Sequence, residues 1–206
     1  MFSSKVSVAP AGSGQTLSVD PKSLDVVVAT IDELAVAGAT RARTVPGMDG
    51  AMYALSWLGD DGRVWFAAAA LEAVRRGRPI PRFLHSVVWI GFESAMVNLV
   101  MKKLVRRPRP AAFAEQERAH DLRIPTDTSF PSGHAASAGT MSVLLSDGSP
   151  LAPVYFSVAA GVGASRVYVG VHHGTDVVVG WAVGAVFGLL GRATGRRLDR
   201  FLAGRP

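Results

Sequence analysis

The sequence predicts an all-α integral membrane protein, a helical bundle of about five membrane spans with an N-terminal amphipathic, interfacial helical region. Of its 206 residues 49% are hydrophobic but only 18% are charged, whereas about a quarter of the residues of a soluble domain are charged. Several apolar runs are rich in Gly and Ala and lack the charged stripe of a soluble helix. Basic residues gather at the ends of these runs, as the positive-inside rule requires of membrane helices.

The N-terminal segment differs in character from the rest of the chain. Residues 1–20 are small and polar, and no apolar run follows Lys5, which argues against a signal peptide. Residues 24–38 are apolar, but Asp32 and Glu33 interrupt this run too early for a membrane span. We therefore expect a helix that lies along the membrane surface.

A turn separates this segment from the more apolar remainder. Residues 48–58 predict a second short helical element, and the Gly-Asp-Asp-Gly sequence at 59–62 predicts a turn. We expect two parts: residues 1–62 form a polar tail and interfacial helices, and residues 63–206 form a membrane-embedded core.

Five apolar runs make up this core, at residues 64–74, 83–101, 135–145, 151–164 and 177–190. A membrane-crossing helix needs about 20 apolar residues, and runs of 10–14 more often belong to soluble proteins. Only the 19-residue run at 83–101 approaches that length, so a soluble helical bundle is the alternative. The missing polar face of residues 177–190 favours the membrane.

The distribution of basic residues predicts the orientation. Two arginine clusters would lie in the cytoplasm, and they comprise Arg75, Arg76, Arg78, Arg82, Arg192, Arg196, Arg197 and Arg200. Alternation of the spans then places Lys102 and residues 165–176 outside. We expect a multi-pass protein of the plasma membrane in which the polar segments that begin at Lys102 and at residue 165 face the extracytoplasmic side.

Composition also excludes several kinds of site. The chain has no cysteine, which rules out disulfides, thiolate zinc sites, iron–sulfur clusters and cysteine nucleophiles. The net charge of +6 suits nucleic acid, an anionic membrane or a phosphorylated substrate. Because the basic residues flank apolar segments and no base-reading module is recognisable, we expect no nucleic-acid partner.

The first polar island is the run Lys102-Lys103-Leu104-Val105-Arg106-Arg107-Pro108-Arg109-Pro110. Lysine offers a mobile point charge and arginine a planar fork, and both suit phosphate oxygens. The prolines would hold the exit from the preceding helix rigid. A solvated helix end, or a contact with lipid headgroups, is the alternative.

The second island, Phe130-Pro131-Ser132-Gly133-His134, has the composition of a helix start. Free backbone N–H groups and the helix dipole favour an anion there. Ser132 adds a hydroxyl donor, Gly133 allows close approach of the backbone, and His134 would face the bound group. An ordinary helix cap beside an incidental histidine is the alternative.

The third island begins with Ser165-Arg166 and continues, five residues later, as His172-His173-Gly174-Thr175-Asp176. An arginine at the edge of an apolar stretch indicates function, because it is costly in lipid. Asp176 follows His172 by four residues, one helical turn, so its carboxylate could orient the imidazole. A metal pair of His172 and His173 is disfavoured, because no further ligand spacing completes a metal site. Two histidines, one carboxylate and several cations suit phosphoryl transfer through a phosphohistidine.

In order and spacing the three islands resemble the type-2 phosphatidic acid phosphatase family, which also includes the vanadium haloperoxidases. The family's motifs are Lys-x6-Arg-Pro, Pro-Ser-Gly-His and Ser-Arg-x5-His-x3-Asp. They match Lys102 to Pro110, Pro131 to His134, and Ser165 to Asp176. The resemblance covers residues 102–176.

The resemblance implies a role for each matched residue. His172 would be the nucleophile, Asp176 its orienting partner and His134 the general acid. The phosphate-binding residues would be Lys102, Arg109, Ser132, Gly133 and Arg166. No metal and no cofactor are implied. Spacing alone selects Arg109 over Arg107, and His172 over His173.

The resemblance also implies a function, hydrolysis of a lipid phosphate or pyrophosphate in the membrane. The small size and the Ala-, Gly-, Val- and Arg-rich composition look most like actinobacterial lipid phosphatases, one type of which acts on decaprenylphosphoryl-5-phosphoribose. Phosphatidate, phosphatidylglycerophosphate and undecaprenyl diphosphate remain alternative substrates. A vanadate-dependent haloperoxidase would be soluble and larger, and a protein that only binds headgroups would not need the histidines. The oligomeric state stays open.

Overall fold

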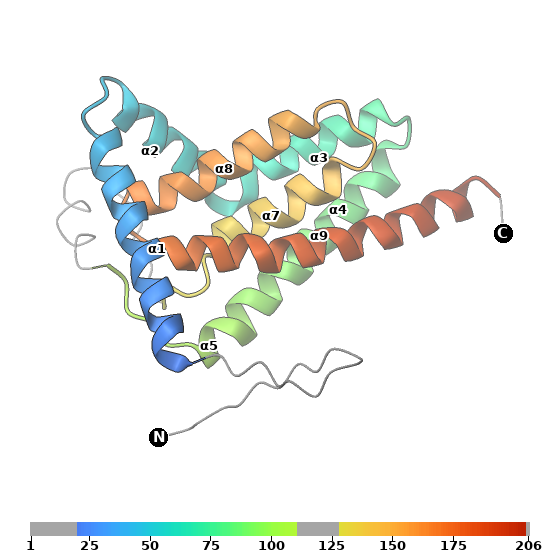
Figure 1. The fold of residues 1–206 in the computed structure, drawn as a ribbon. Helices are drawn as coiled ribbons and strands as arrows, with labels where there is room; N and C mark the ends of the chain where they lie inside the picture. Colours follow the sequence, from blue (N-terminus) through green and yellow to red (C-terminus); the bar gives the residue numbers. More distant parts are fainter. Residues whose placement is uncertain (1–19, 111–127, 205–206) are drawn as a thin grey trace, which may run out of the picture.

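The computed structural model describes residues 20–110 and 128–204, and the described residues form helices joined by short connections, without a strand (Figure 1). The all-α prediction is thereby confirmed. The helical elements are α1 (Pro21–Ala42), α2 (Met48–Gly59), the short 3-10 turn η1 (Asp60–Gly62), α3 (Arg63–Arg75), α4 (Pro79–Ala95), the wide turn η2 (Met96–Met101), α5 (Lys102–Leu104), α7 (Gly133–Leu145), α8 (Ala152–Tyr168) and α9 (Gly174–Leu202). The predicted polar tail lies, except for Asp20, outside the described residues.

Helices α7 and α9 pack against each other along a line of glycines. Gly180, Gly184 and Gly188 recur every four residues and so share one face of α9. A Cβ atom at Gly180 would lie 2.6 Å from the Ser132 carbonyl oxygen, and one at Gly188 would lie 2.7 Å from that of Thr140. The two backbones are therefore too close for any side chain, which is how small residues serve helix packing in membranes.

The core joins α7 to the helices α3, α4 and α8. Its members include large buried aromatic and aliphatic side chains, among them Trp65, Ile90, Met141, Leu144, Leu145 and Tyr155. Since α7 contributes to this core and also packs against the glycine line of α9, α7 is the central helix of the bundle (Figure 1).

Two stretches are long and apolar enough to cross a membrane, Pro79–Leu104 and Gly174–Phe201. The first is the continuous helix made by α4, η2 and α5. In the most apolar 18-residue stretch of each helix, only 22% and 28% of the residues, respectively, are buried. Most of the apolar surface of these two helices therefore faces away from the bundle. Helices α3, α7 and α8 have 13, 13 and 17 residues, and the number of five spans remains a prediction.

Helix α1 crosses the ends of α8 and α9 rather than running beside them (Figure 1). Its inner face is lined by partly buried residues, including Ile31, Ala35 and Ala39. A Cβ atom at Gly174, the first residue of α9, would lie 2.6 Å from that of Ala35. The expected helix over residues 24–38 is therefore present, and it is docked at the start of α9.

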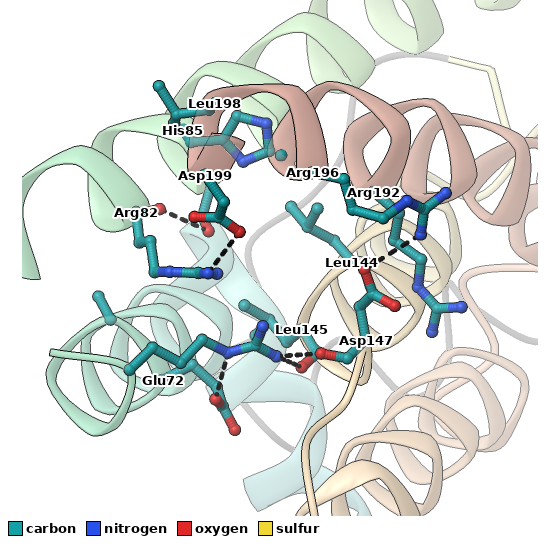
Figure 2. Close-up of a pocket in the computed structure, with 14 residues that line it drawn as sticks. Glu72, Arg82, His85, Leu144, Leu145, Asp147, Arg192, Arg196, Leu198 and Asp199 are labelled. Carbon is teal, nitrogen blue, oxygen red and sulfur yellow. Dashed lines mark hydrogen bonds and ion pairs between the residues drawn. The ribbon is translucent and has the colours of Figure 1, made fainter. Parts of the chain in front are cut away.

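Ion pairs hold the opposite end of the bundle together (Figure 2). Glu72 is buried and accepts hydrogen bonds from Arg76 Nε at 3.0 Å and from the Tyr155 hydroxyl at 2.9 Å. Arg82 pairs with Asp199 at 2.5 Å. The four charged groups, Glu72, Arg76, Arg82 and Asp199, line a cavity of only about 50 Å³. Because their charges are paired with one another, we assign the cluster a structural role.

The structure corrects two predicted boundaries. Helix α8 continues past residue 164 to Tyr168, so Ser165 and Arg166 lie within its last turn. Helix α9 has 29 residues and begins at Gly174, whereas the apolar run covers only residues 177–190. Hydropathy marks the part of a helix that avoids water, and the arginine-rich continuation of α9 is helical but polar.

Candidate active site

A cavity of about 510 Å³ lies among the ends of α2, α3, α4, α7 and α8. Its walls include six of the eight residues predicted for the site: Lys102, Arg109, Gly133, His134, Arg166 and His172. The other two, Ser132 and Asp176, are fully buried next to residues of the wall. The three sequence islands therefore meet at one place.

Ser132 is the N-cap of α7. Its hydroxyl oxygen accepts a hydrogen bond from the Ala135 N–H at 3.4 Å, and its own N–H donates to the Asp176 carbonyl at 3.0 Å. The capping alternative thus describes what the Ser132 side chain does in this structure. The cap places Gly133 and His134 in the first turn of α7, on the cavity wall. A phosphate-binding role for Ser132 stays a prediction.

A tight loop brings His172 back toward Arg166. Gly170 adopts a left-handed conformation with φ 74°, and the N–H groups of Val171 and His172 both donate to the Arg166 carbonyl at 3.2 Å. A left-handed residue is accessible to glycine at little cost. The loop therefore places a residue from the last turn of α8 and a residue after α8 on the same cavity.

The expected geometry of His172 and Asp176 requires a correction. His172 lies before α9, whose N-cap is His173, so no helical turn connects it to Asp176. Asp176 instead forms a capping box: its Oδ2 accepts from the His173 N–H at 2.9 Å. The same oxygen lies 3.7 Å from His172 Nδ1 and 3.1 Å from His173 Nδ1. His172 and Asp176 are therefore neighbours because Asp176 caps the start of α9, and not because a helical turn brings them together.

His172 is only 4% exposed, and burial lowers the pKa of its imidazole to about 4. The positive charges of Arg166 and Arg109 act in the same direction, and Asp176 opposes them. The ring is therefore neutral at pH 7. A neutral imidazole has the free lone pair that a nucleophile requires.

Arg166 is held from two sides in the cavity wall. Its Nη1 donates to the Ser56 hydroxyl at 2.5 Å and lies 3.8 Å from Asp60 Oδ1. Its exposed fraction is only 7%. Helix α2 and the η1 turn, both outside the three sequence islands, thus fix the position of this cation.

His134 has a partner that the sequence did not suggest. Its Nε2 donates to Asp60 Oδ1 at 2.8 Å. Burial raises the pKa of the Asp60 carboxyl, but this hydrogen bond and the charges of His134, Arg166 and Arg63 outweigh burial and lower that pKa. We interpreted Asp60 as part of a turn, which it is. No residue pattern links that turn to His134, 74 positions further along the chain.

The two arginines of the doubled Arg-Pro sequence have different surroundings. Arg109 lines the cavity and donates to the Val171 carbonyl at 2.8 Å. Arg107 instead contacts Asp176, donating to Oδ1 at 2.8 Å, and Asp32, donating to Oδ2 at 2.5 Å. The motif spacing selected Arg109 over Arg107, and Arg109 is the one that lines the cavity. The sequence did not predict the contacts of Arg107 with Asp176 and Asp32.

Within residues 20–110 and 128–204, no three His, Asp or Glu side chains are grouped closely enough to hold a metal ion. In that part of the chain, the alternative pair of His172 and His173 has Asp176 beside it but no complete ligand set.

Comparison with known proteins places this geometry in a family. The sequence matches the PAP2 superfamily over residues 83–199. It is 33% identical to the decaprenylphosphoryl-5-phosphoribose phosphatase of Mycobacterium tuberculosis, over 77% of this chain and 88% of the relative. It is 35% identical to the undecaprenyl-diphosphatase of Sulfolobus acidocaldarius, over 67% of this chain and 66% of the relative.

Two solved structures share the fold. The transmembrane PAP2 type phosphatidylglycerolphosphate phosphatase of Bacillus subtilis superimposes with a TM-score of 0.64 at 24% identity, over 85% of this chain and 89% of that one. Aquifex aeolicus LpxE gives a TM-score of 0.56 at 30% identity, over 71% of this chain and 86% of that one.

The fold and the relatives define the protein as an enzyme of the phosphatase class, with the architecture of a membrane phosphatase. The chain belongs to the PAP2 superfamily, which confirms the resemblance seen in its three motifs.

Proposed function

We propose that this protein is a membrane lipid-phosphate phosphatase, that it works through a phosphohistidine, and that its favoured substrate is decaprenylphosphoryl-5-phosphoribose or another polyprenyl phosphate. The observation that carries the proposal is the cavity itself, where two histidines and three cations converge. The identity with the mycobacterial relative over most of both chains supports the choice of lipid.

The first chemical step transfers the phosphoryl group to His172. Its neutral imidazole attacks phosphorus, the P–N bond forms as the P–O bond to the leaving alcohol breaks, and His134 donates a proton to that oxygen. Lys102, Arg109 and Arg166 stabilise the charge on the transferred oxygens. Asp176 stabilises the positive charge that develops on His172.

The second step returns the enzyme to its starting state. Water attacks phosphorus, the P–N bond breaks, and His134 takes a proton from the water, which replaces the proton that it donated in the first step. The products are inorganic phosphate and the free alcohol. Burial and the charge of Arg166 lower the pKa of the His134 imidazole, and Asp60 opposes them because its carboxylate accepts the imidazole proton in a hydrogen bond. Asp60 therefore favours the protonated form that His134 needs at the start of each cycle.

The cavity also has an apolar wall that suits a lipid. Phe66 of α3 and Ile90 of α4 line it, and α4 belongs to a long helix whose apolar surface faces outward. We infer that the first carbons of the lipid chain lie against these two side chains, while the phosphate lies among the cations.

The orientation follows from charge. Arg76, Arg82, Arg192 and Arg196 surround the small cavity at the opposite end of the bundle (Figure 2). The positive-inside rule favours the cytoplasm for that end, so the phosphatase cavity would face the extracytoplasmic side. Helix α1 would then lie along the outer membrane surface, where Val26, Val27 and Leu34, each more than half exposed, would contact lipid.

The decisive experiment is phosphate release by the detergent-purified protein in the presence of EDTA. The panel contains decaprenylphosphoryl-5-phosphoribose, polyprenyl mono- and diphosphates, phosphatidate and phosphatidylglycerophosphate. We expect release, fastest from a polyprenyl substrate and unchanged by the chelator, in keeping with a mechanism that needs no metal.

Two variants serve as controls in this assay. His172→Ala should reduce turnover by at least about a thousandfold, because it removes the nucleophile. His85→Ala removes a histidine at the opposite end of the bundle and should retain activity. No release by the wild type from any lipid would favour a headgroup-binding protein, and wild-type turnover in His172→Ala would refute the nucleophile assignment.

A further inference from the structure

We propose that helix α1 helps to position the catalytic residues. Asp32 of α1 and Arg107, which follows α5, act as positioning residues that hold Asp176 and, through it, His172. This inference rests on the proposed function in so far as it names His172 as the nucleophile. The family match begins at residue 83, so Asp32 lies outside the part of the chain that identifies the superfamily.

Asp32 joins α1 to the start of α9. Its Oδ1 accepts hydrogen bonds from the Thr175 N–H and from the Thr175 hydroxyl, both at 2.8 Å. The N–H groups in the first turn of a helix have no partner within the helix, and a carboxylate is favoured there by the helix dipole. Asp32 therefore acts as a cap for α9 that comes from a different helix.

Arg107 extends this contact to the carboxylate next to His172. One of its terminal nitrogens, Nη2, donates to Asp32 Oδ2 at 2.5 Å. The other, Nη1, donates to Asp176 Oδ1 at 2.8 Å and to the Thr175 hydroxyl at 2.6 Å. The guanidinium plane thus joins two carboxylates, for which arginine is better suited than lysine because its donors are fixed in one plane.

As a consequence, the positions of both carboxylate oxygens of Asp176 are fixed. Arg107 binds Oδ1 and the His173 N–H binds Oδ2, so the two contacts together fix the rotation of the carboxylate group, and Oδ2 faces the rings of His172 and His173. Asp176 is fully buried, so water does not offer an alternative set of donors. Without Arg107 the carboxylate would be held only at Oδ2, by the His173 N–H, and its distance to His172 would be less closely defined.

The three groups also set the charge near His172. Asp32, Arg107 and Asp176 together carry a net charge of −1. Among the described residues, the charges of Arg166 from α8 and Arg109 from the loop after α5 also act on the imidazole, and His173 shares Asp176 Oδ2 with it. Removing the charge of Asp32 leaves Arg107 and Asp176, which sum to zero. Removing the charge of Arg107 leaves the two carboxylates, which sum to −2. The two substitutions should therefore move the proton affinity of His172 in opposite directions.

The test compares Asp32→Asn, Arg107→Gln and Asp32→Glu with the wild type. Glu33→Gln is the matched control, because Glu33 is the exposed neighbour of Asp32 on the same helix. The lipid that the wild type hydrolyses fastest serves as substrate. We expect kcat to fall on the order of 10- to 100-fold in Asp32→Asn and Arg107→Gln, with KM changed less than about threefold, since neither residue lines the cavity. Asp32→Glu should restore part of the loss, and Glu33→Gln should match the wild type.

The second readout needs no substrate. The five histidines are labelled with ¹³C at Cε1, the His172 signal is assigned from its absence in His172→Ala, and the ring is titrated by NMR. We expect the His172 midpoint to move to lower pH in Asp32→Asn and to higher pH in Arg107→Gln. Simple loosening of the site would instead expose the ring and move both midpoints toward the ordinary value of about 6.5.

The outcomes separate this inference from the proposed function. Equal kcat in wild type and Asp32→Asn, or His172 midpoints that move upward in both variants, would overturn the positioning role. If the wild type hydrolyses no lipid in the panel, the proposed function fails, but the NMR titration still decides whether Asp32 and Arg107 act on His172. A thermal unfolding curve for each variant, compared with that of the wild type, tests whether the helical bundle is still folded.

Discussion

The Nε2 of His134 and the Oδ1 of Asp60 lie 2.8 Å apart, so the histidine that we propose as the proton donor is paired with a carboxylate from the turn between α2 and α3. The same oxygen lies 3.8 Å from Arg166. Asp60 Oδ1 therefore lies close to both His134 and Arg166. It positions our proposed proton donor together with one of the proposed phosphate-binding residues.

Asp60→Asn should lower kcat by about 10- to 100-fold, because the amide no longer stabilises the protonated imidazole of His134. Phosphate release across pH 5–9 measures the effect. In a His134→Ala background the same substitution should add little further loss, since the partner is already gone. Additive losses in the double variant would show that Asp60 acts independently of His134.

The buried state of His172 predicts how stability depends on pH. The folded pKa of about 4 is below the unfolded value of about 6.5, so between these values the unfolded chain binds a proton that the folded chain does not. The contribution of His172 to the free energy of unfolding is complete above pH 6.5 and falls as the pH drops toward 4. Thermal unfolding of the wild type and of His172→Ala over pH 4–8 measures this. A constant difference between the two across that range would contradict the prediction.

Gly184→Ala should separate α7 from α9. A Cβ atom there would overlap the Ala136 carbonyl, and overpacking of this kind costs about 1–3 kcal/mol. Because α7 carries His134 and α9 carries Asp176, activity should fall with stability. Gly38→Ala is the control: nothing lies within 4 Å of its Cβ position, so the substitution should be neutral or stabilising. Equal melting temperatures for the two variants would show that the glycine line is dispensable.

Glu72→Ala should destabilise the bundle without changing the chemistry. The substitution leaves the Tyr155 hydroxyl and part of Arg76 without their partner in a buried setting, which costs about 2–4 kcal/mol. The cluster (Figure 2) includes none of the residues that line the active-site cavity. At a temperature where the variant is folded, kcat should equal that of the wild type, and a large loss of kcat would place this cluster in the catalytic machinery.

The sequence predicted most of the helices and six residues of the cavity wall. Apolar runs and turn residues depend on short-range chemistry, which is why α2 and α3 begin and end within about one residue of the predicted limits. The ends of α8 and α9 were less well predicted, because a helix continues into polar sequence when no residue stops it. The relation of His172 to Asp176 was predicted for the wrong reason, since a four-residue spacing indicates a helical turn only inside a helix.

The amino-acid sequence by itself determined the family, the reaction class and the residues of the three motifs, because motif spacing is a property of the linear chain. Only the tertiary structure decided the partners of those residues: Asp60 for His134, Ser56 for Arg166, and Asp32 with Arg107 for Asp176. The donors and acceptors in these contacts are up to 110 positions apart. They meet because α1, α2 and η1 pack across the ends of the helices that carry the motifs, and no local pattern encodes that packing.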